Sequence, residues 1–472
     1  MQSGVWAFGL IWMIGAVQVS CSTDTTDSPS DGNRGSVVSH GVISSVDGIT
    51  VNGVKFDTSR AEIIVNGSST DRTALQPGMV VRVAGDESDD SRSASRIEHD
   101  RDLHGPISSV DGVNRRFTVL GRTVAVLPDT GIRGGDFDSL AMNDRVAVSG
   151  FTDADGVLRA RFIDEDGEGG LELEGEISNL STLDRSFFIG SQRVDYSAAA
   201  LRGFPAGGIA GGQWVEVLGN SVDGGVLRAT SLRYESGVLA SGNGQAVDLE
   251  GLVQRLESGS SFRVERQLVR VNSSTRYLPN GTSFASLATN SRVFVSGRTD
   301  TDGAVLASRI ELAPHTDAEV FGQVDSVDGS DDSLVVLGRT LATTARTVFD
   351  DQSNGALRPF GLGDVRNGDW VRVAGYVESD GDYIATRLER RDAPARLRVE
   401  GPATVESANQ TLRVAGVRVE TNNQTEFRDG NGAGVSRDQF FSQLATSPSL
   451  RVRAAGGRSG SSIVAAVAEL RN

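Results

Sequence analysis

One short pattern recurs six times along this chain, and the repetition constrains the fold more than any single residue does. Each copy opens with a glycine and a run of alternating residues, and the clearest copies then turn at Val-Asp-Gly. The openings are Gly41, Gly105, Gly175, Gly251, Gly322 and Gly401. Successive openings are about 64 to 79 residues apart, which is the length of one small domain. The sequence therefore predicts an array of six units.

Apolar and polar residues alternate within each unit, which is typical of half-buried strands. In the second unit this alternation predicts strands at residues 107–110, 116–121, 123–126, 144–149 and 158–163. Any helix is expected between the third and the fourth strand. A glycine ends the fourth strand of every unit, which suits a bulge or sharp bend at a barrel corner. These glycines are Gly85, Gly150, Gly219, Gly297, Gly375 and Gly456.

Five strands with an interruption after the third match the strand order of an OB-like Greek-key barrel. A unit of this size buries only about 60% of its unfolded surface, so closing the sheet on itself would help. We therefore predict an all-β fold, a tandem array of six small five-stranded OB-like barrels, each with its own interior. The predicted boundaries are 40–100, 104–166, 172–236, 248–313, 319–391 and 397–472. The short polar linkers permit either beads on a string or a stacked rod.

The repeated motifs resemble a bacterial repeat family catalogued as domain of unknown function 5666. The resemblance is carried by the Gly-x-Ile-x-Ser-Val-Asp opening, by Phe-Thr-Val-Leu-Gly-Arg-Thr-Val at 117–124 and by Val-x-Val-x-Gly in the fourth strand. The closing segments at 307–311 and 385–389 also belong to it. The resemblance implies an exported protein or lipoprotein built from one module, and it implies no activity.

The N-terminus resembles that of an exported lipoprotein, although no Lys or Arg precedes its apolar run. Residues 5–17 are apolar, which suits a signal-peptide core and is too short to span a bilayer. The following Gln-Val-Ser-Cys resembles the lipobox of bacterial lipoproteins, in which the cysteine is diacylated. The sequence predicts a lipoprotein-type signal peptide over 1–20, lipidation of Cys21 and a flexible polar tether over 21–39. A secreted protein cleaved nearby and an uncleaved anchor are the alternatives.

The residue after Cys21 also bears on location. By resemblance to enterobacterial sorting rules, Ser22 in place of aspartate favours the outer membrane over the inner one. The expected location is thus the bacterial cell envelope, with the membrane as partner through the lipid.

Composition argues against several functions. The chain has 62 acidic and 46 basic residues and a net charge of -16, which argues against nucleic-acid binding because such binding depends on neutralising phosphates. Cys21 is the only cysteine, so no internal disulfide can form. No catalytic or phosphate-binding motif is found, and the four histidines lack metal-ligand spacing. We expect no enzyme, no cofactor and no deep pocket that gathers several titratable groups.

Two acidic turns leave cation binding open. The turns at 153–156 and 300–303 resemble the start of calcium loops, so Asp153, Asp155, Asp300 and Asp302 are calcium candidates. A plain hairpin turn is the simpler interpretation of both.

Two tryptophans are candidates for a contact surface. Trp214 and Trp370 begin fourth strands in opposite phase to the inward valines, although packing between modules would explain them equally. The sequence predicts a non-enzymatic envelope lipoprotein that presents β-modules to an envelope protein or polysaccharide, or scaffolds the envelope. The alternative is a protein that binds cations or polysaccharide through the acidic turns or these tryptophans.

Overall fold

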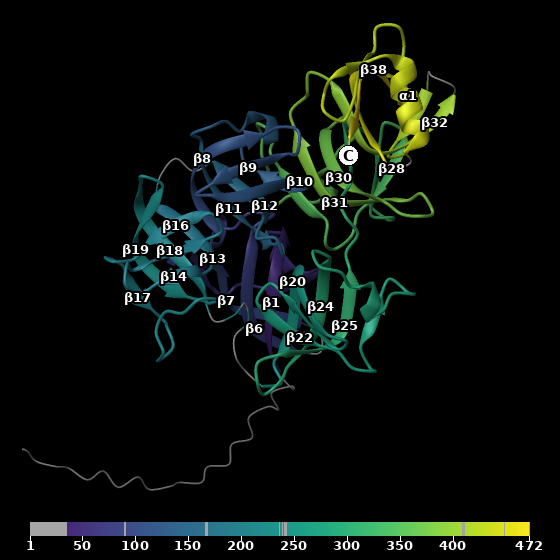
Figure 1. Ribbon diagram of the computed structural model, residues 1–472. Coiled ribbons are helices and arrows are strands. Elements are labelled where there is room, and N and C mark those ends of the chain that lie inside the picture. The colour runs from purple at the N-terminus through teal and green to yellow at the C-terminus, as the bar shows by residue number, and fades with distance from the viewer. Residues whose placement is uncertain are drawn as a thin grey trace, which may run out of the picture.

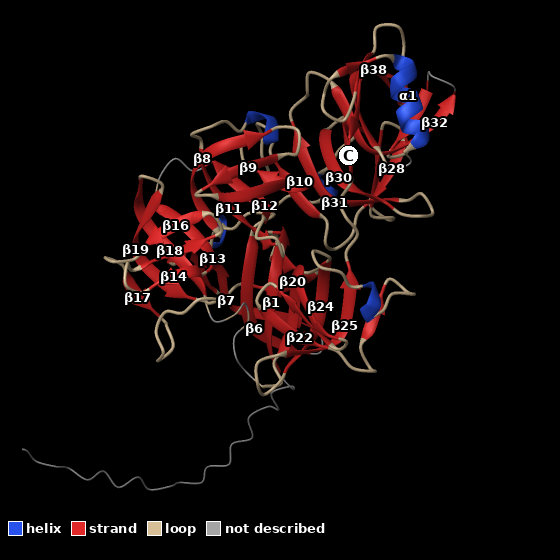
Figure 2. Ribbon diagram, viewed as in Figure 1, coloured by secondary structure: helices blue, strands red, loops and turns tan. Residues whose placement is uncertain are grey.

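The computed structural model describes residues 35–88, 91–165, 169–235, 237, 239, 243–407, 411–447 and 449–471. The predicted signal peptide, the lipidation site Cys21 and nearly all of the tether lie outside the described residues. Within them the chain is all-β, with strands in every repeat and one α-helix (Figure 2). No helix in this part of the chain has both the length and the apolar character needed to cross a membrane.

The first three repeats contain strands β1 to β19 (Figure 1). Repeat 1 comprises β1 (Gly35–Ser45), β2 (Ile49–Val51), β3 (Val54–Asp57), β4 (Glu62–Val65), β5 (Ser68–Thr70), the 3-10 turn η1 (Arg72–Ala74), β6 (Val80–Ser88) and β7 (Ser91–His99). Repeat 2 comprises β8 (Leu103–Asp111), β9 (Arg116–Val119), β10 (Arg122–Ile132), η2 (Phe137–Ser139), β11 (Arg145–Thr152) and β12 (Leu158–Glu165). Repeat 3 comprises β13 (Leu171–Glu176), β14 (Ser178–Ser181), β15 (Ser186–Ile189), β16 (Gln192–Asp195), β17 (Ala200–Arg202), β18 (Trp214–Asp223) and β19 (Val226–Tyr234).

The last three repeats follow the same plan. Repeat 4 comprises β20 (Ala246–Ser258), β21 (Ser261–Val264), β22 (Gln267–Arg270), β23 (Arg276–Leu278), η3 (Phe284–Ser286), β24 (Arg292–Thr299) and β25 (Val305–Leu312). Repeat 5 comprises β26 (Ala318–Asp328), β27 (Ser333–Val336), β28 (Arg339–Ala342), β29 (Val348–Asp351), η4 (Leu362–Asp364), β30 (Trp370–Val377) and β31 (Tyr383–Arg391). Repeat 6 comprises β32 (Leu397–Ser407), β33 (Thr411–Val414), β34 (Val417–Glu420), β35 (Glu426–Arg428), β36 (Gly434–Val435), α1 (Arg437–Thr446), β37 (Arg451–Ser459) and β38 (Ser462–Arg471). The helical segments lie before the fourth strand, as predicted.

The strands of each repeat form a closed circuit of backbone pairing. In repeat 1, β1 pairs antiparallel with β2 and β6, β2 pairs with β3, and β6 pairs with β7. A parallel pairing between β3 and β7 closes the circuit. The same circuit recurs in repeat 5, where β28 and β31 make the parallel closure. Alternate residues of these strands, such as Val81 and Val83, are therefore buried inside.

The recurring glycine lies within each fourth strand rather than at its end, and it sits at a register shift in every repeat, so the predicted bulge is confirmed. In repeat 2 the pairing of β11 with β12 shifts between Ser149 and Gly150, and in repeat 5 that of β30 with β31 shifts at Gly375. A Cβ atom at Gly150 would overlap the carbonyl oxygen of Arg159 on the partner strand. Glycine is required here because the two backbones approach closely.

The repeats join in pairs through their first strands. Repeats 1 and 4 share one sheet because β1 runs parallel to β20, with residues 37–40 opposite 246–249. Repeats 2 and 3 share a second sheet through β8 and β13, and repeats 5 and 6 a third through β26 and β32. Figure 1 shows the three pairs as three lobes, with repeats 1 and 4 together although two repeats separate them in sequence.

The prediction that every unit has its own interior is wrong for four of the six repeats. One continuous hydrophobic core serves repeats 2 and 3, and another serves repeats 5 and 6. Repeats 1 and 4 keep largely separate cores. Small residues let repeats 5 and 6 approach closely at their joint. Gly401 of repeat 6 is one of them: a Cβ atom there would lie 2.9 Å from the Cβ of Ala415 and 3.2 Å from the Cβ of Ala318 in repeat 5.

Candidate functional site at the junction of repeats 1 to 4

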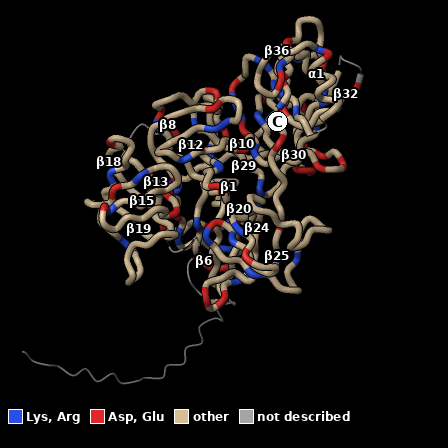
Figure 3. Tube along the Cα trace, viewed as in Figure 1, with Lys and Arg blue, Asp and Glu red and all other residues tan. Residues whose placement is uncertain are grey.

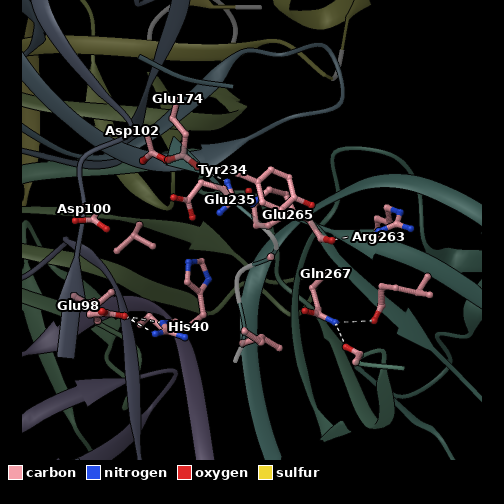
Figure 4. A pocket seen from close by; sticks show the side chains of 18 of the residues that line it. His40, Glu98, Asp100, Asp102, Glu174, Tyr234, Glu235, Arg263, Glu265 and Gln267 are labelled. Carbon is pink, nitrogen blue, oxygen red and sulfur yellow. Dashed lines mark hydrogen bonds and ion pairs between the residues drawn. The ribbon is translucent and has the colours of Figure 1, made fainter. Parts of the chain in front are cut away.

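A cavity of about 940 Å³ lies where repeats 1 to 4 meet (Figure 4). Repeat 1 contributes His40 of β1 and Glu98 of β7, and the linker before repeat 2 contributes Asp100 and Asp102. Glu174 of β13 and Glu235 after β19 come from repeat 3, and Glu265 comes from the turn between β21 and β22 of repeat 4. The expectation that no pocket gathers several titratable groups is therefore wrong, because the repeats fold back on one another and bring their linkers together.

An ion pair and an aromatic ring tie repeat 3 to repeat 4 at the cavity wall. The indole Nε1 of Trp214 donates to Glu174 Oε1 at 2.6 Å. The guanidinium group of Arg266 pairs with the same oxygen and lies 5.1 Å from the Trp214 ring centroid. The half-buried Trp214 thus contacts another module, which corresponds to the packing alternative for this residue.

Several carboxyl groups around the cavity are held away from water. Burial raises the pKa of Asp102 and of Glu235 to about 7 and that of Glu265 to about 8. Glu265 accepts hydrogen bonds from the backbone nitrogens of Leu252, at 3.0 Å, and Thr152, at 3.4 Å. Burial also lowers the pKa of His40 to about 4, so this imidazole is neutral at pH 7. The three carboxyl groups can therefore exchange protons near neutral pH.

These pKa shifts predict that stability falls as pH rises from about 6.5 to 8.5. In the unfolded chain the carboxyl groups ionise near pH 4. The folded chain holds its protons longer on Asp102, Glu235 and Glu265, so it binds more protons in this window and the free energy of unfolding decreases with pH. The pKa values of the buried His40 and His99 are lowered, so these two residues oppose the trend near pH 6.5, where an unfolded histidine still holds about half a proton, and the opposition fades by about pH 7.5. Thermal melting should show a drop of about 3 °C or more.

Glu265→Gln supplies the matched variant for this measurement, because glutamine mimics the protonated acid. The variant should show a shallower pH slope, whereas Asp47→Asn, at a side chain that is 71% exposed, should keep the parent slope. A melting temperature that is constant or rises over the window would contradict the assigned burial of these acids.

The four calcium candidates have partners of another kind. Asp153 accepts from the backbone nitrogens of Asp155 and Val157 and pairs with Arg159 at 3.1 Å. Asp300 and Asp302 both pair with Arg270. Nowhere in the described residues do three or more His, Cys, Asp or Glu side chains gather in a way that could hold a metal ion. The geometry favours the hairpin-turn interpretation of both acidic turns.

Trp370 begins β30 and is half-buried against the shared core of repeats 5 and 6. His99 at the end of β7 and His104 in β8 flank the linker between repeats 1 and 2 and are the histidines nearest in sequence to one another, but they contact different partners. His99 Nδ1 lies 2.8 Å from the carbonyl oxygen of Val80, and His104 Nδ1 contacts that of Gly170. Neither arrangement forms a ligand set.

A buried ion network, which sequence reasoning missed, lies in repeat 5. Arg387, Glu389 and Asp350 are 1%, 0% and 4% exposed, and Arg387 pairs with Glu389 at 2.5 Å and Asp350 at 2.9 Å. Arg372 pairs with Glu389 at 3.1 Å and with Glu319 at 2.8 Å. The signal was present in the Ala-Thr-Arg-Leu-Glu motif at 385–389, where the apolar Leu388 stands between the two charged residues.

The network reaches other repeats through the end of β10. Arg372 Nη2 donates to the carbonyl oxygen of Pro128 at 2.7 Å. Asp129 pairs with Arg161 at 2.7 Å and with Arg292 of repeat 4 at 3.5 Å. Burial alone would raise the pKa of Asp129, but the two guanidinium groups outweigh it and lower this pKa to about 2. Charges of both signs are interspersed over the repeats (Figure 3), and here they meet between modules.

The closed circuits and the shared sheets define an all-β repeat protein. The chain belongs to the family described as Domain of unknown function (DUF5666), which it matches over residues 40–98, 104–164, 174–233, 250–311, 321–389 and 400–466. No curated protein matches it. A solved structure described as "drosophila Unr CSD456" is 15% identical over 46% of this chain and 95% of that chain, with a TM-score of 0.11. A TM-score this low does not establish a common fold.

Proposed function

We propose that this chain is a non-enzymatic scaffold of the bacterial cell envelope, built from six OB-like barrels and anchored through lipid on Cys21. The observation that carries the proposal is the way in which the repeats are joined. First strands pair between repeats, and buried charges link repeats that are distant in sequence. Such joints suit a body that holds its surfaces in fixed positions rather than a flexible string of beads.

The pairing circuit supports the OB-like assignment. The first strand pairs with the second and fourth, and the third pairs in parallel with the fifth, which is the order that closes a five-stranded Greek-key barrel. The split third strand supports it further, because β29 continues the parallel pairing with β31 after β28.

Side-chain contacts support a rigid body as well. Arg92 of repeat 1 pairs with Asp248 of repeat 4, and Arg346 of repeat 5 pairs with Glu311 of repeat 4 at 2.5 Å. The Arg346 guanidinium also lies 4.0 Å from the ring centroid of Phe294. Such a body would bind an envelope protein or polysaccharide on its surface. The tether and the lipid would attach it to the membrane.

Membrane fractionation and X-ray scattering of the parent protein and its Cys21→Ser variant test this proposal. Cys21→Ser should move the protein from the membrane to the soluble fraction, because the acyl chains supply the membrane affinity. The released chain should scatter X-rays as one compact particle. Its scattering profile should stay unchanged when the salt concentration is raised, because the contacts between repeats are largely buried. Unchanged membrane association of the variant would remove the anchor, and a scattering profile of independent beads would remove the scaffold.

A further inference from the structure

A second, smaller cavity of about 280 Å³ lies between repeats 1 and 2 and is separate from the junction described above. Gln76, Met79 and His99 of repeat 1 form one wall, and Ser149 and Phe162 of repeat 2 form the other. The cavity is slightly smaller than the range of about 300 to 1,000 Å³ that is usual for drug-sized ligands. A ligand that fills it is therefore small.

Ser149 lines this cavity, and its hydroxyl group has no partner in the described part of the protein. Its side chain is 2% exposed, and Oγ has no hydrogen-bond partner among the described residues. The same position in repeat 4 is Ser296, whose hydroxyl donates to Asp248 Oδ1 at 2.6 Å. Repeats 1, 5 and 6 have alanine there, namely Ala84, Ala374 and Ala455. The barrel does not need this hydroxyl, and a buried hydroxyl without a partner lowers stability, so a ligand atom is its natural partner.

The neighbouring groups add acceptors. His99 Nδ1 lies 2.8 Å from a carbonyl oxygen, so this nitrogen carries the proton and Nε2 is an acceptor. Burial lowers the pKa of His99, which keeps the ring neutral. Gln76 donates its amide nitrogen to the carbonyl oxygen of Thr73 at 3.2 Å, which leaves its side-chain oxygen as an acceptor. A ligand that pairs with all of these groups needs both hydrogen-bond donors and acceptors. A hydroxyl group provides both.

The charges around the cavity are balanced. Arg101 pairs with Glu172 at 2.5 Å, and Arg133 pairs with Asp164 at 3.0 Å. An anionic ligand would have to compete with Asp164 for Arg133, so a neutral ligand fits better. Met79 and Phe162 supply an apolar surface beside the polar groups.

We infer that the cavity between repeats 1 and 2 binds a neutral polyhydroxylated ligand the size of one sugar residue, with Ser149, His99 and Gln76 as its hydrogen-bonding groups. The apolar wall packs against the C–H face of such a ring. Arg133 also lines the cavity, and its side chain is 43% exposed. The ligand is a free sugar or the end residue of a glycan, since both present the same ring.

Saturation-transfer NMR with glucose, N-acetylglucosamine and myo-inositol tests this inference on the full chain. At least one probe should bind saturably, and Ser149→Ala should weaken that binding about fivefold because one hydrogen bond is lost. The melting temperature of Ser149→Ala should stay equal or rise, since the substitution removes an unpartnered buried hydroxyl. Maltotriose binding equal to that of glucose would identify a glycan end, and binding of glucose alone a free sugar.

Ser296→Ala is the matched control. It should keep the parent affinity but lower the melting temperature, because this hydroxyl has a partner in the protein. The inference is overturned if no neutral probe binds the parent chain, if Ser149→Ala binds as the parent does, or if gluconate is preferred over glucose.

Discussion

Replacement of Arg387 by methionine is expected to destabilise repeat 5 by about 3 to 5 kcal/mol. Arg387 is the cation between Glu389 and Asp350, and all three side chains are buried. Without it Asp350 loses its buried cationic partner, and Glu389 keeps only Arg372 and Arg391. A buried charge without a partner costs more than an exposed one because water cannot solvate it.

The effect of Arg387→Met should extend beyond repeat 5. The side chain reaches repeats 1 and 2, where glycines make room for it: a Cβ at Gly78 would lie 2.9 Å from Arg387 Nη1, and one at Gly131 would overlap the guanidinium group. Urea unfolding of the chain from residue 21 onward, which lacks Trp6 and Trp12, with Trp214→Phe leaves Trp370 as the fluorescent tryptophan and measures the loss directly in repeat 5. Arg270→Met is the matched control, since its ion pairs are exposed and should contribute less than about 1 kcal/mol. Equal effects of the two variants would contradict the assigned role of the buried network.

Gly150→Ala is expected to destabilise the protein by about 3 kcal/mol. The added methyl group would overlap the carbonyl oxygen of Arg159 at the bulge between β11 and β12. The obstacle is backbone, which cannot move aside without breaking the pairing of the two strands.

Gly112→Ala in the same repeat is the control for this prediction, because a Cβ there meets nothing within 4 Å. It should change stability by less than about 0.5 kcal/mol. Thermal or urea unfolding of the two variants side by side gives the comparison. If Gly150→Ala proved as mild as Gly112→Ala, the bulge could not be the reason for the glycine within every fourth strand.

Most of the repeat itself could be predicted from the sequence. The alternation of Val146 and Val148, and the glycine that follows them, indicates an inward face and a bulge, and both are present. These features depend on the local order of apolar, polar and glycine residues, which is present within the sequence of each repeat.

The way in which repeats meet could not be predicted, because an outward polar residue looks the same whether it faces water or another module. Arg372 stands between the buried Val371 and Val373 and is itself 6% exposed, since repeat 2 covers it. Likewise, Asp102 and Glu265 are more than 150 positions apart in the chain. The sequence around either residue therefore does not indicate that both line one cavity.

The parallel seam between β1 and β20 has a consequence for how such a chain can evolve. In solenoids each repeat contacts only its neighbours, so copies can be gained or lost one at a time. Here the first strand of repeat 1 pairs with the first strand of repeat 4, although repeats 2 and 3 lie between them in the sequence. Deleting or duplicating a single copy would leave some first strand without its counterpart, so we expect copies of such an array to be gained or lost in pairs.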